Sequence, residues 1–289
     1  MAVTVYPVSE ALGARIEGVN LARPLGPETF AHIEEALHEH CVVVLPRQAL
    51  GPGDFVGFAR RWGPPEPHVI DTFHHPADPS ILILSNLKRD GKPIGLADAG
   101  TYFHTDYSYL AVPARCTMVH ALEVPEHNAG TTFANQASAY EDLPAAMKRR
   151  IEALVVRHHY GNRDDLDDSS RTAASVLNAD QKKKVSWVRH KLVRRHSGTG
   201  RRTLYAVSGS SFDIEGMGEV EGRELLDELK EHATHPRYCY THDYRVGDVV
   251  IWDNIQLLHR APLVDYSRPR TLWRITVLEA NGGSRGEFA

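Results

Sequence analysis

Short apolar or alternating runs separated by turn residues fill the second half of the chain, and this pattern restricts the fold more than any other feature. Residues 192–193 and 204–207 flank a Ser-Gly-Thr-Gly turn, which predicts a hairpin. Further strands are predicted at residues 237–241, 249–252 and 271–278. Many short strands with few long helices are typical of a β-sandwich or barrel. We therefore predict mainly β structure with flanking helices, in a single domain over residues 1–289.

Helices are expected where apolar residues recur every three or four positions, at residues 27–40, 52–62, 143–154 and 219–232. The apolar run Val42–Leu45 is ended by Pro46 and predicts a buried strand, with another strand near 81–84. Residues 160–190 are rich in charge and show no steady periodicity. They predict an exposed insertion, and long loops in compact domains often act as lids over a site.

Composition narrows the class of protein. The formal net charge is -4, so no overall positive field would hold a nucleic-acid backbone. No stretch approaches 18 apolar residues, and the N-terminus lacks a basic start followed by an apolar run, so we expect neither a membrane span nor a signal peptide. The three cysteines form no metal-binding spacing and suit a reducing cytoplasm, with Cys41 and Cys239 expected in the core.

A His-x-Asp pair lies in the aromatic segment 102–109, whose residue types favour a strand. On a strand His104 and Asp106 would project from one face, roughly 6–7 Å apart along the backbone. His259 follows an apolar pair after a strand-turn-strand pattern. Two histidines and one carboxylate leave three positions open on an iron ion, which suits a keto-acid plus dioxygen, whereas a structural zinc site would be closed by four protein ligands.

Two arginines, Arg270 and Arg274, are predicted on the last strand and would share a face. A guanidinium matches a carboxylate in a bidentate manner, so the pair predicts binding of an acid. The alternative is that both arginines pair with acidic side chains of the protein itself.

Several motifs occur in order along nearly the whole chain: FHTDYSY, GTTFANQASAYEDLP, GRRTLYAVSGSSFDIEGM and VGDVVIWDNIQLLHRAPLVDYSRPRTLWRITV. Together they resemble the taurine dioxygenase and 2,4-dichlorophenoxyacetate dioxygenase family. The resemblance implies a double-stranded β-helix (jelly-roll) core. It also implies Fe(II), 2-oxoglutarate and O2, with ascorbate as the reductant in vitro, and a homo-oligomer, either a dimer or a tetramer.

The resemblance also implies residue roles, carried over position by position. His104, Asp106 and His259 match the three iron ligands, which form the catalytic centre. Thr131 and Arg270 match residues that bind 2-oxoglutarate, Arg270 at its distal carboxylate. Arg274 matches an arginine near the keto-acid end, which can also hold the anionic group of the substrate. His68, after WGPPEP, matches a histidine that contacts the substrate.

Two departures from the family pattern bear on the substrate. The family reads G-G-D-T where this chain has Asn128-Ala129-Gly130-Thr131, so the Asp is missing while Thr131 is kept. Taurine-specific members carry polar residues for the amine where this chain has Ala99 and Gly100, and a buried ammonium would lack partners. An anionic substrate with an apolar body is expected, an aryloxyalkanoate-like carboxylic acid first, with an alkyl sulfonate or sulfate ester or an N-substituted amino acid as alternatives.

Three functions of other classes stay open on the sequence. A non-oxidative metal-dependent hydrolase on a jelly roll would need no 2-oxoglutarate and leaves Arg270 without a purpose. A small-acid binding protein could keep the fold, but an intact ligand set argues against it. A nucleic-acid demethylase is disfavoured by the acidic net charge.

Overall fold

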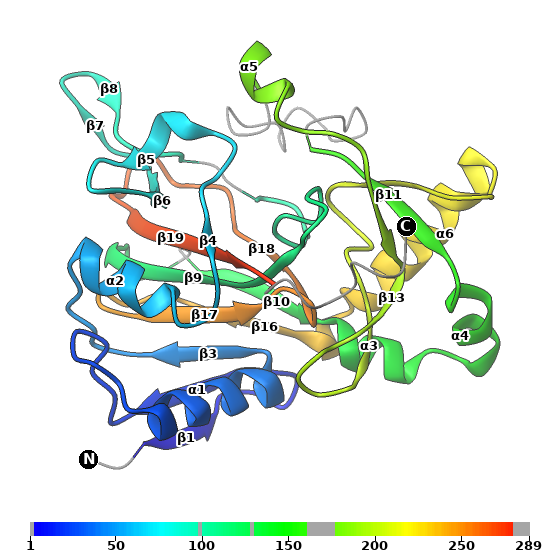
Figure 1. The fold of residues 1–289 in the computed structure, drawn as a ribbon, viewed down its shortest axis with the longest axis horizontal. Coiled ribbons are helices and arrows are strands. Elements are labelled where there is room, and N and C mark those ends of the chain that lie inside the picture. The colour runs from blue at the N-terminus through cyan, green and yellow to red at the C-terminus, as the bar shows by residue number, and fades with distance from the viewer. Residues whose placement is uncertain (1–2, 98–99, 128–129, 161–176, 280–289) are drawn as a thin grey trace.

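Short strands make up most of the structure, a computed structural model that describes residues 3–97, 100–127, 130–160 and 177–279 (Figure 1). The largest sheet contains β1 (Thr4–Pro7), β2 (Ala14–Glu17), β3 (Val42–Leu45), β17 (Val249–Asp253), β9 (Ala114–Glu123), β19 (Thr271–Leu278), β6 (Asp78–Ser85) and β5 (His74–His75), in that order, and β4 (Pro65–Glu66) pairs with β19. A second sheet has the order β16 (Cys239–His242), β10 (Thr131–Asn135), β18 (Leu257–Arg260).

The central strands of the large sheet are buried on both faces because each face meets a different layer. Along β17, Val249 and Ile251 pack on one side while Val250 and Trp252 pack on the other, as the two-residue period of a strand requires. The first side is covered by helices α1 (Pro27–His40) and α2 (Pro52–Ala59). The second side faces the three-stranded sheet.

The core between the two sheets is where the functional side chains lie. Phe133 of β10 and Leu257 of β18 pack in one cluster with Val119 and Trp252 of the large sheet. Two facing sheets decorated by helices confirm the predicted β-sandwich class, and the sheets stay open rather than closing into a barrel.

A third layer of helices and short strands lies beside the sandwich, at the right of Figure 1. It contains α3 (Gln136–Asp142), α4 (Ala145–Ile151), α6 (Glu219–Ala233), the sheet β12 (Val188–Lys191), β11 (Val155–His158), β15 (Ser211–Ile214), and the hairpin β13 (Val193–Arg195), β14 (Arg202–Leu204). Leucines of α6 share a core cluster with the apolar residues of α3, α4 and β11. The remaining elements are the pair β7 (Lys88–Arg89), β8 (Lys92–Pro93), the helix α5 (Ala179–Lys182) and the 3-10 turns η1 (Asp71–Phe73) and η3 (Pro236–Tyr238).

Several sequence predictions are confirmed, and others need correction. The helices at 27–40 and 219–232 and the strands at 42–45, 249–252 and 271–278 are present. The single helix at 143–154 is wrong: α3 ends before Leu143 and α4 begins after Pro144, because proline restricts the residue before it to extended backbone.

Other boundaries are shifted. The helix expected at 52–62 ends at Ala59, and the second hairpin strand covers 202–204 rather than 204–207. The strand expected at 237–241 begins only at Cys239, after η3. Cys41 is fully buried, but Cys239 is only partly so. Within the excursion at 160–190, residues 161–176 lie outside the described residues.

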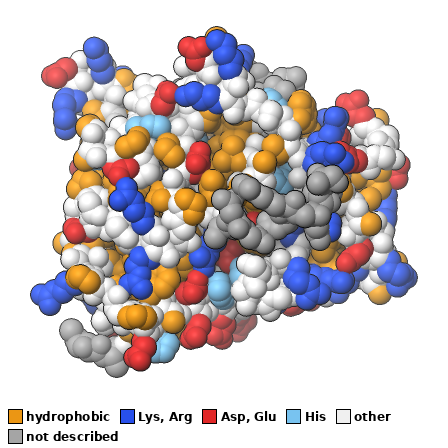
Figure 2. Space-filling model, viewed as in Figure 1, with side chains coloured by type: hydrophobic (Ala, Val, Ile, Leu, Met, Phe, Trp, Pro, Cys, Tyr) orange, Lys and Arg blue, Asp and Glu red, His pale blue; other side chains and the backbone are white. Residues whose placement is uncertain are grey.

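Among the described residues, no helix is long and apolar enough to cross a membrane. Basic and acidic side chains both occur over most of the face drawn in Figure 2, so this face carries no broad area of one sign. The mixture of charges on this face agrees with the similar numbers of basic and acidic residues in the sequence, 33 and 37.

Candidate metal and substrate site

The segment 102–109 does not form the strand that its aromatic residues predicted. Only His104 pairs with a strand, through two backbone N···O hydrogen bonds of 3.0 and 2.9 Å with His259 of β18. Tyr107 then adopts a left-handed φ of 53°, so the chain turns away and the tertiary context overrides the strand propensity. The bridge sets His104 directly opposite His259, with ring centroids 4.2 Å apart.

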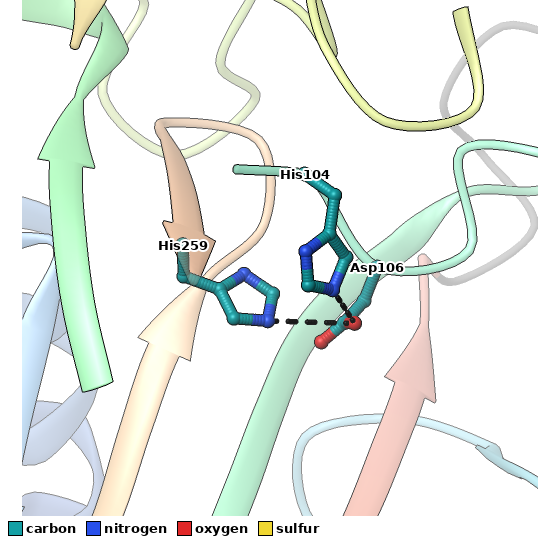
Figure 3. Close-up of side chains that lie close together, drawn as sticks. All are labelled: His104, Asp106 and His259. Carbon is teal, nitrogen blue, oxygen red and sulfur yellow. Dashed lines mark ion pairs between the residues drawn. The ribbon is translucent and has the colours of Figure 1, made fainter. Parts of the chain in front are cut away.

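The side chains of His104, Asp106 and His259 point at one another across this bridge (Figure 3). Asp106 Oδ1 lies 3.5 Å from Nε2 of His104 and 3.6 Å from Nε2 of His259. Each residue offers one ligand atom, and these three atoms lie within 4.8 Å of one another. Among the described residues, this is the group that could hold a metal ion.

The carboxylate of Asp106 is ionised and held from both oxygens. Burial alone would raise its pKa, but Arg274, His259 and His104 hold it well below the usual range. Arg274 Nη2 lies 2.6 Å from Oδ1, so the alternative that an arginine pairs with an acidic side chain of the protein is realised for Arg274. The hydroxyl of Thr117 donates to Oδ2 at 2.7 Å.

Both imidazoles suit a metal. His104 Nδ1 lies 2.9 Å from the carbonyl oxygen of Tyr102, which assigns the proton to Nδ1 and leaves the lone pair on Nε2. Burial lowers the pKa of His259 to about 3, so its ring is neutral at pH 7. Two imidazole nitrogens and one carboxylate oxygen are the donor set that Fe(II) takes in oxygenases, and the residues therefore fit that ion.

One pocket, partly open to solvent, brings most of the predicted site residues together. Its polar lining comprises His104, His259, Thr131, Arg270 and Arg274, and its apolar lining includes Leu84, Val119, Trp252 and Leu272. Thr131 Oγ1 lies 2.9 Å from the hydroxyl of Tyr244, another lining residue. Arg270 precedes β19 instead of lying on it, but both arginines reach the pocket and are buried.

His68 lies in a neighbouring cavity rather than in this pocket. That cavity, also partly open to solvent, is lined by His68, Tyr107, Tyr109, Leu110 and Val185 among others. The ring of Tyr107 lies 5.9 Å from the guanidinium carbon of Arg274 and 5.9 Å from the ring of His68. Arg274 therefore stands between the two cavities.

The chemical state of His68 follows from its surroundings. Burial, assisted by the charge of Arg274, lowers the pKa of His68 to about 3. Its Nδ1 accepts a hydrogen bond of 3.1 Å from the backbone N–H of Ile70, so the proton of the neutral ring sits on Nε2. His68 is a hydrogen-bond donor rather than a cation at pH 7.

The described part of the 160–190 excursion borders the second cavity. Lys184 and Val185 line it, and Gln181 and Lys184 bond to Asp71 at 3.3 and 3.2 Å. Gln181 is buried, so this part of the excursion is packed against the cavity wall rather than fully solvated.

Sequence reasoning missed the residues that surround the triad from other strands. Thr117 bonds to Asp106, Asn254 bonds to Thr117, and Tyr244 bonds to Thr131. The fold brings these residues together, and no spacing in the sequence signals that. Gly100 was read as a missing polar residue, and the structure adds a reason: a Cβ there would collide with the ring of His104, and φ is 71°. Ala99 lies outside the described residues.

Comparison with known proteins places the chain in one family. The family model described as "Taurine catabolism dioxygenase TauD, TfdA family" matches residues 4–276. The chain is 33% identical over 290 residues to an alpha-ketoglutarate-dependent 2,4-dichlorophenoxyacetate dioxygenase of Cupriavidus pinatubonensis, covering 96% of this chain and 99% of the relative. It is 32% identical over 286 residues to a pentalenolactone F synthase of Streptomyces arenae, covering 95% and 94%.

A solved structure agrees with the predicted core. The crystal structure of AAD-2 in complex with Mn(II) and N-oxalylglycine superposes with a TM-score of 0.80 at 28% identity, covering 97% of this chain and 98% of AAD-2. The jelly-roll prediction is thereby confirmed. With a family match over nearly the whole chain, the protein belongs to the TauD, TfdA family of dioxygenases, which use Fe(II), 2-oxoglutarate and O2.

Proposed function

We propose that this dioxygenase hydroxylates a C–H bond of a small anionic substrate with an apolar body, with an aryloxyalkanoate-like carboxylic acid as the favoured class. The observation that carries the proposal is a pocket lined by two buried arginines and by the two histidines of a two-histidine, one-carboxylate triad. Carboxylic acids are the ligands that buried guanidinium groups match.

The proposed roles follow from the geometry. His104, Asp106 and His259 would hold Fe(II). Arg270 and Thr131 would hold 2-oxoglutarate in the pocket that they share with His104 and His259. Iron, 2-oxoglutarate and O2 together supply the oxidation: R–H, O2 and 2-oxoglutarate become R–OH, succinate and CO2. The residues of the chain bind and orient the two acids, and the apolar lining keeps bulk water from the reacting C–H bond.

Arg274 and His68 would receive the acidic group of the substrate. Arg274 pairs with Asp106 through Nη2, so the substrate would meet its other N–H donors, and the neutral His68 supplies one Nε2–H donor. The cavity beyond them has an aromatic wall of Tyr107 and Tyr109, whose ring centroids lie 5.6 Å apart, and Tyr160 packs edge-on against Tyr109 at 4.7 Å. Such a wall suits an aryl or other apolar body, as in the 2,4-dichlorophenoxyacetate substrate named for the Cupriavidus relative.

Within the same family the substrate class has competitors. Alkyl sulfonates, sulfate esters and N-substituted amino acids would also meet Arg274, and pentalenolactone F synthase is about as similar to this chain as the phenoxyacetate enzyme. A free amine such as that of taurine is disfavoured because Gly100 leaves no room for a polar side chain next to His104.

The experiment that tests this proposal is succinate formation by the purified protein with Fe(II), ascorbate, 2-oxoglutarate and a panel of phenoxyacetates, alkanesulfonates and N-acyl amino acids. We expect succinate to rise with phenoxyacetates and to vanish with a chelator. A rise with another class would replace the aryloxyalkanoate assignment. Absence of succinate in protein shown to hold iron would contradict the proposed roles of the site.

Replacing His68 with leucine is expected to weaken binding of the substrate without affecting 2-oxoglutarate. Leucine has a side-chain volume similar to that of histidine but cannot donate a hydrogen bond to the substrate acid. Such a bond to a charged group is worth about 1.5–3 kcal/mol, so we expect the KM for the acid to rise by about 10-fold or more. Steady-state kinetics with each substrate varied in turn measure both constants. An equal rise in the KM for 2-oxoglutarate would show that His68 does not serve the substrate alone.

Three broader assignments belong to the same proposal. We infer a single catalytic domain, because strands from early and late in the chain pair in one sheet. The family resemblance favours a homo-oligomer, and the thiol content favours the cytoplasm.

A further inference from the structure

Two buried residues outside the triad, Thr117 and Asn254, are joined to Asp106 by hydrogen bonds that run in one direction. Asn254 Nδ2 donates to Thr117 Oγ1 at 2.9 Å, and the Thr117 hydroxyl donates to Asp106 Oδ2 at 2.7 Å. A hydroxyl has one proton, so an amide that donates to its lone pair leaves that proton for the carboxylate. Thr117 and Asn254 have no exposed surface, so water does not compete for these bonds.

Strand register fixes this chain of donors. Thr117 is the cross-strand partner of Trp252 on β17 and of Thr276 on β19, and Asn254 follows β17 directly. Thr276 Oγ1 lies 3.1 Å from Thr117 Oγ1 and 3.3 Å from Arg274 Nη2. Because the guanidinium can only donate to Thr276, the hydroxyl of Thr276 can donate its own hydrogen bond to Thr117.

The backbone that carries Asn254 is itself anchored. The neighbouring Asp253 accepts the N–H of Ile255 at 2.9 Å, and its other oxygen lies 2.8 Å from Nε2 of the buried His196. The N–H of Asn254 donates to the carbonyl of Arg115 at 2.9 Å. The amide of Asn254 is therefore aimed at Thr117 by a turn that has little freedom to move.

The χ2 torsion of aspartate has a broad distribution, so the side chain does not fix the orientation of its two oxygens by itself. A hydrogen-bond donor such as Thr117 is needed to fix it. With Oδ2 occupied by Thr117, Oδ1 is the oxygen turned toward Nε2 of both histidines. Nη2 of Arg274 lies 2.6 Å from the same oxygen, so the guanidinium also favours this rotation of the carboxylate. We propose that Thr117 and Asn254 are positioning residues that hold Asp106 so that it offers a metal ion one oxygen only. This assignment rests on the proposed role of Asp106 as a metal ligand.

Single-oxygen ligation would have a consequence for the reaction. Two histidines and one carboxylate oxygen occupy three positions of a six-coordinate ion and leave three for a bidentate keto-acid and O2. An aspartate that rotates freely, or that binds through both oxygens, would weaken the site or take one of the open positions.

The test is Mn(II) affinity, measured by calorimetry and by the electron paramagnetic resonance signal of free Mn(II), in two variants of Thr117. Thr117→Val keeps the shape but removes the hydroxyl, and we expect binding about 10-fold weaker or more, since loss of a hydrogen-bond partner of a metal ligand typically costs roughly 10–100-fold. Thr117→Ser keeps the hydroxyl and should stay close to the unsubstituted protein.

Thr203→Val is the matched control, because Thr203 is also fully buried but its hydroxyl bonds to the carbonyl of Leu204. It should leave Mn(II) affinity unchanged. Unchanged affinity in Thr117→Val, equal weakening in Thr117→Ser, or equal weakening in Thr203→Val would each overturn the assignment. Should Thr117→Val fail to fold, Asn254→Ala decides: a smaller but measurable weakening is expected, and no weakening overturns the proposal.

The failure of this inference is distinguishable from failure of the proposed metal centre. An unsubstituted protein that binds no Mn(II) would overturn both. Tight binding that is lost in His259→Ala but kept in Thr117→Val would overturn the positioning role alone.

Discussion

The variant His259→Ala is expected to reduce metal-dependent succinate formation by more than roughly 100-fold. Losing a residue that only hydrogen-bonds to a metal ligand costs up to about 100-fold, and losing the ligand itself should cost more. His259 is buried, and its Nε2 is one of three donor atoms that converge within 4.8 Å. Removing it leaves an incomplete donor set. Succinate released with saturating Fe(II) and calorimetric Mn(II) binding measure the loss, and both should fall together.

His120→Ala is the matched control for this substitution. His120 is equally buried, but its ring packs against Phe55 and Trp273, and its Nε2 contacts the carbonyl of Gln48 at 3.1 Å. The control should lose stability while its Mn(II) affinity stays unchanged. If His259→Ala keeps metal-dependent turnover, the assignment of the triad is wrong.

The second large effect is expected at Arg270, whose replacement by leucine should raise the KM for 2-oxoglutarate by about 100-fold or more. A buried carboxylate that loses its charged partner is destabilised by about 3 kcal/mol or more, and each 1.4 kcal/mol is a factor of ten. Arg270 is 8% exposed and lines the pocket together with Thr131. Initial rates with 2-oxoglutarate varied at saturating substrate measure the effect.

Arg268→Leu is the control, because Arg268 lies two positions earlier and pairs with Asp265 on the exposed loop. Its KM for 2-oxoglutarate should match that of the unsubstituted protein. An unchanged KM in Arg270→Leu would mean that another cation holds the distal carboxylate, and Arg274 would be the first residue to substitute next.

The residues of the triad could be predicted from the sequence, but the reason given for their convergence was wrong. The i, i+2 rule for strands predicts His104 and Asp106 on one face of a strand. In the structure the chain turns at Tyr107, and an isolated β-bridge between His104 and His259 brings the three side chains together. The prediction of proximity succeeded because short spacing keeps two side chains close in either conformation.

The partners of the triad could not be predicted, because they depend on register. Thr117 and Thr276 are far apart in the chain and face each other only when β9 and β19 pair. A shift of one residue would turn Thr117 toward the helices, where its neighbours Cys116 and Met118 pack. The central strands β3 and β17 contain continuous apolar runs, which give no sign of which face of the sheet holds the site.

The bridge between His104 and His259 also governs when the site can exist during synthesis. During synthesis His104 and Asp106 are made long before β18. These two residues alone would bind a divalent ion only weakly. The third donor arrives only with β18, which pairs with β10 and with His104. An ion bound there would tie distant stretches of chain into a closed loop, so its binding free energy would add to the folding free energy. Iron would therefore load only onto a nearly complete chain, and its loss would destabilise the contact between early and late parts of the polypeptide.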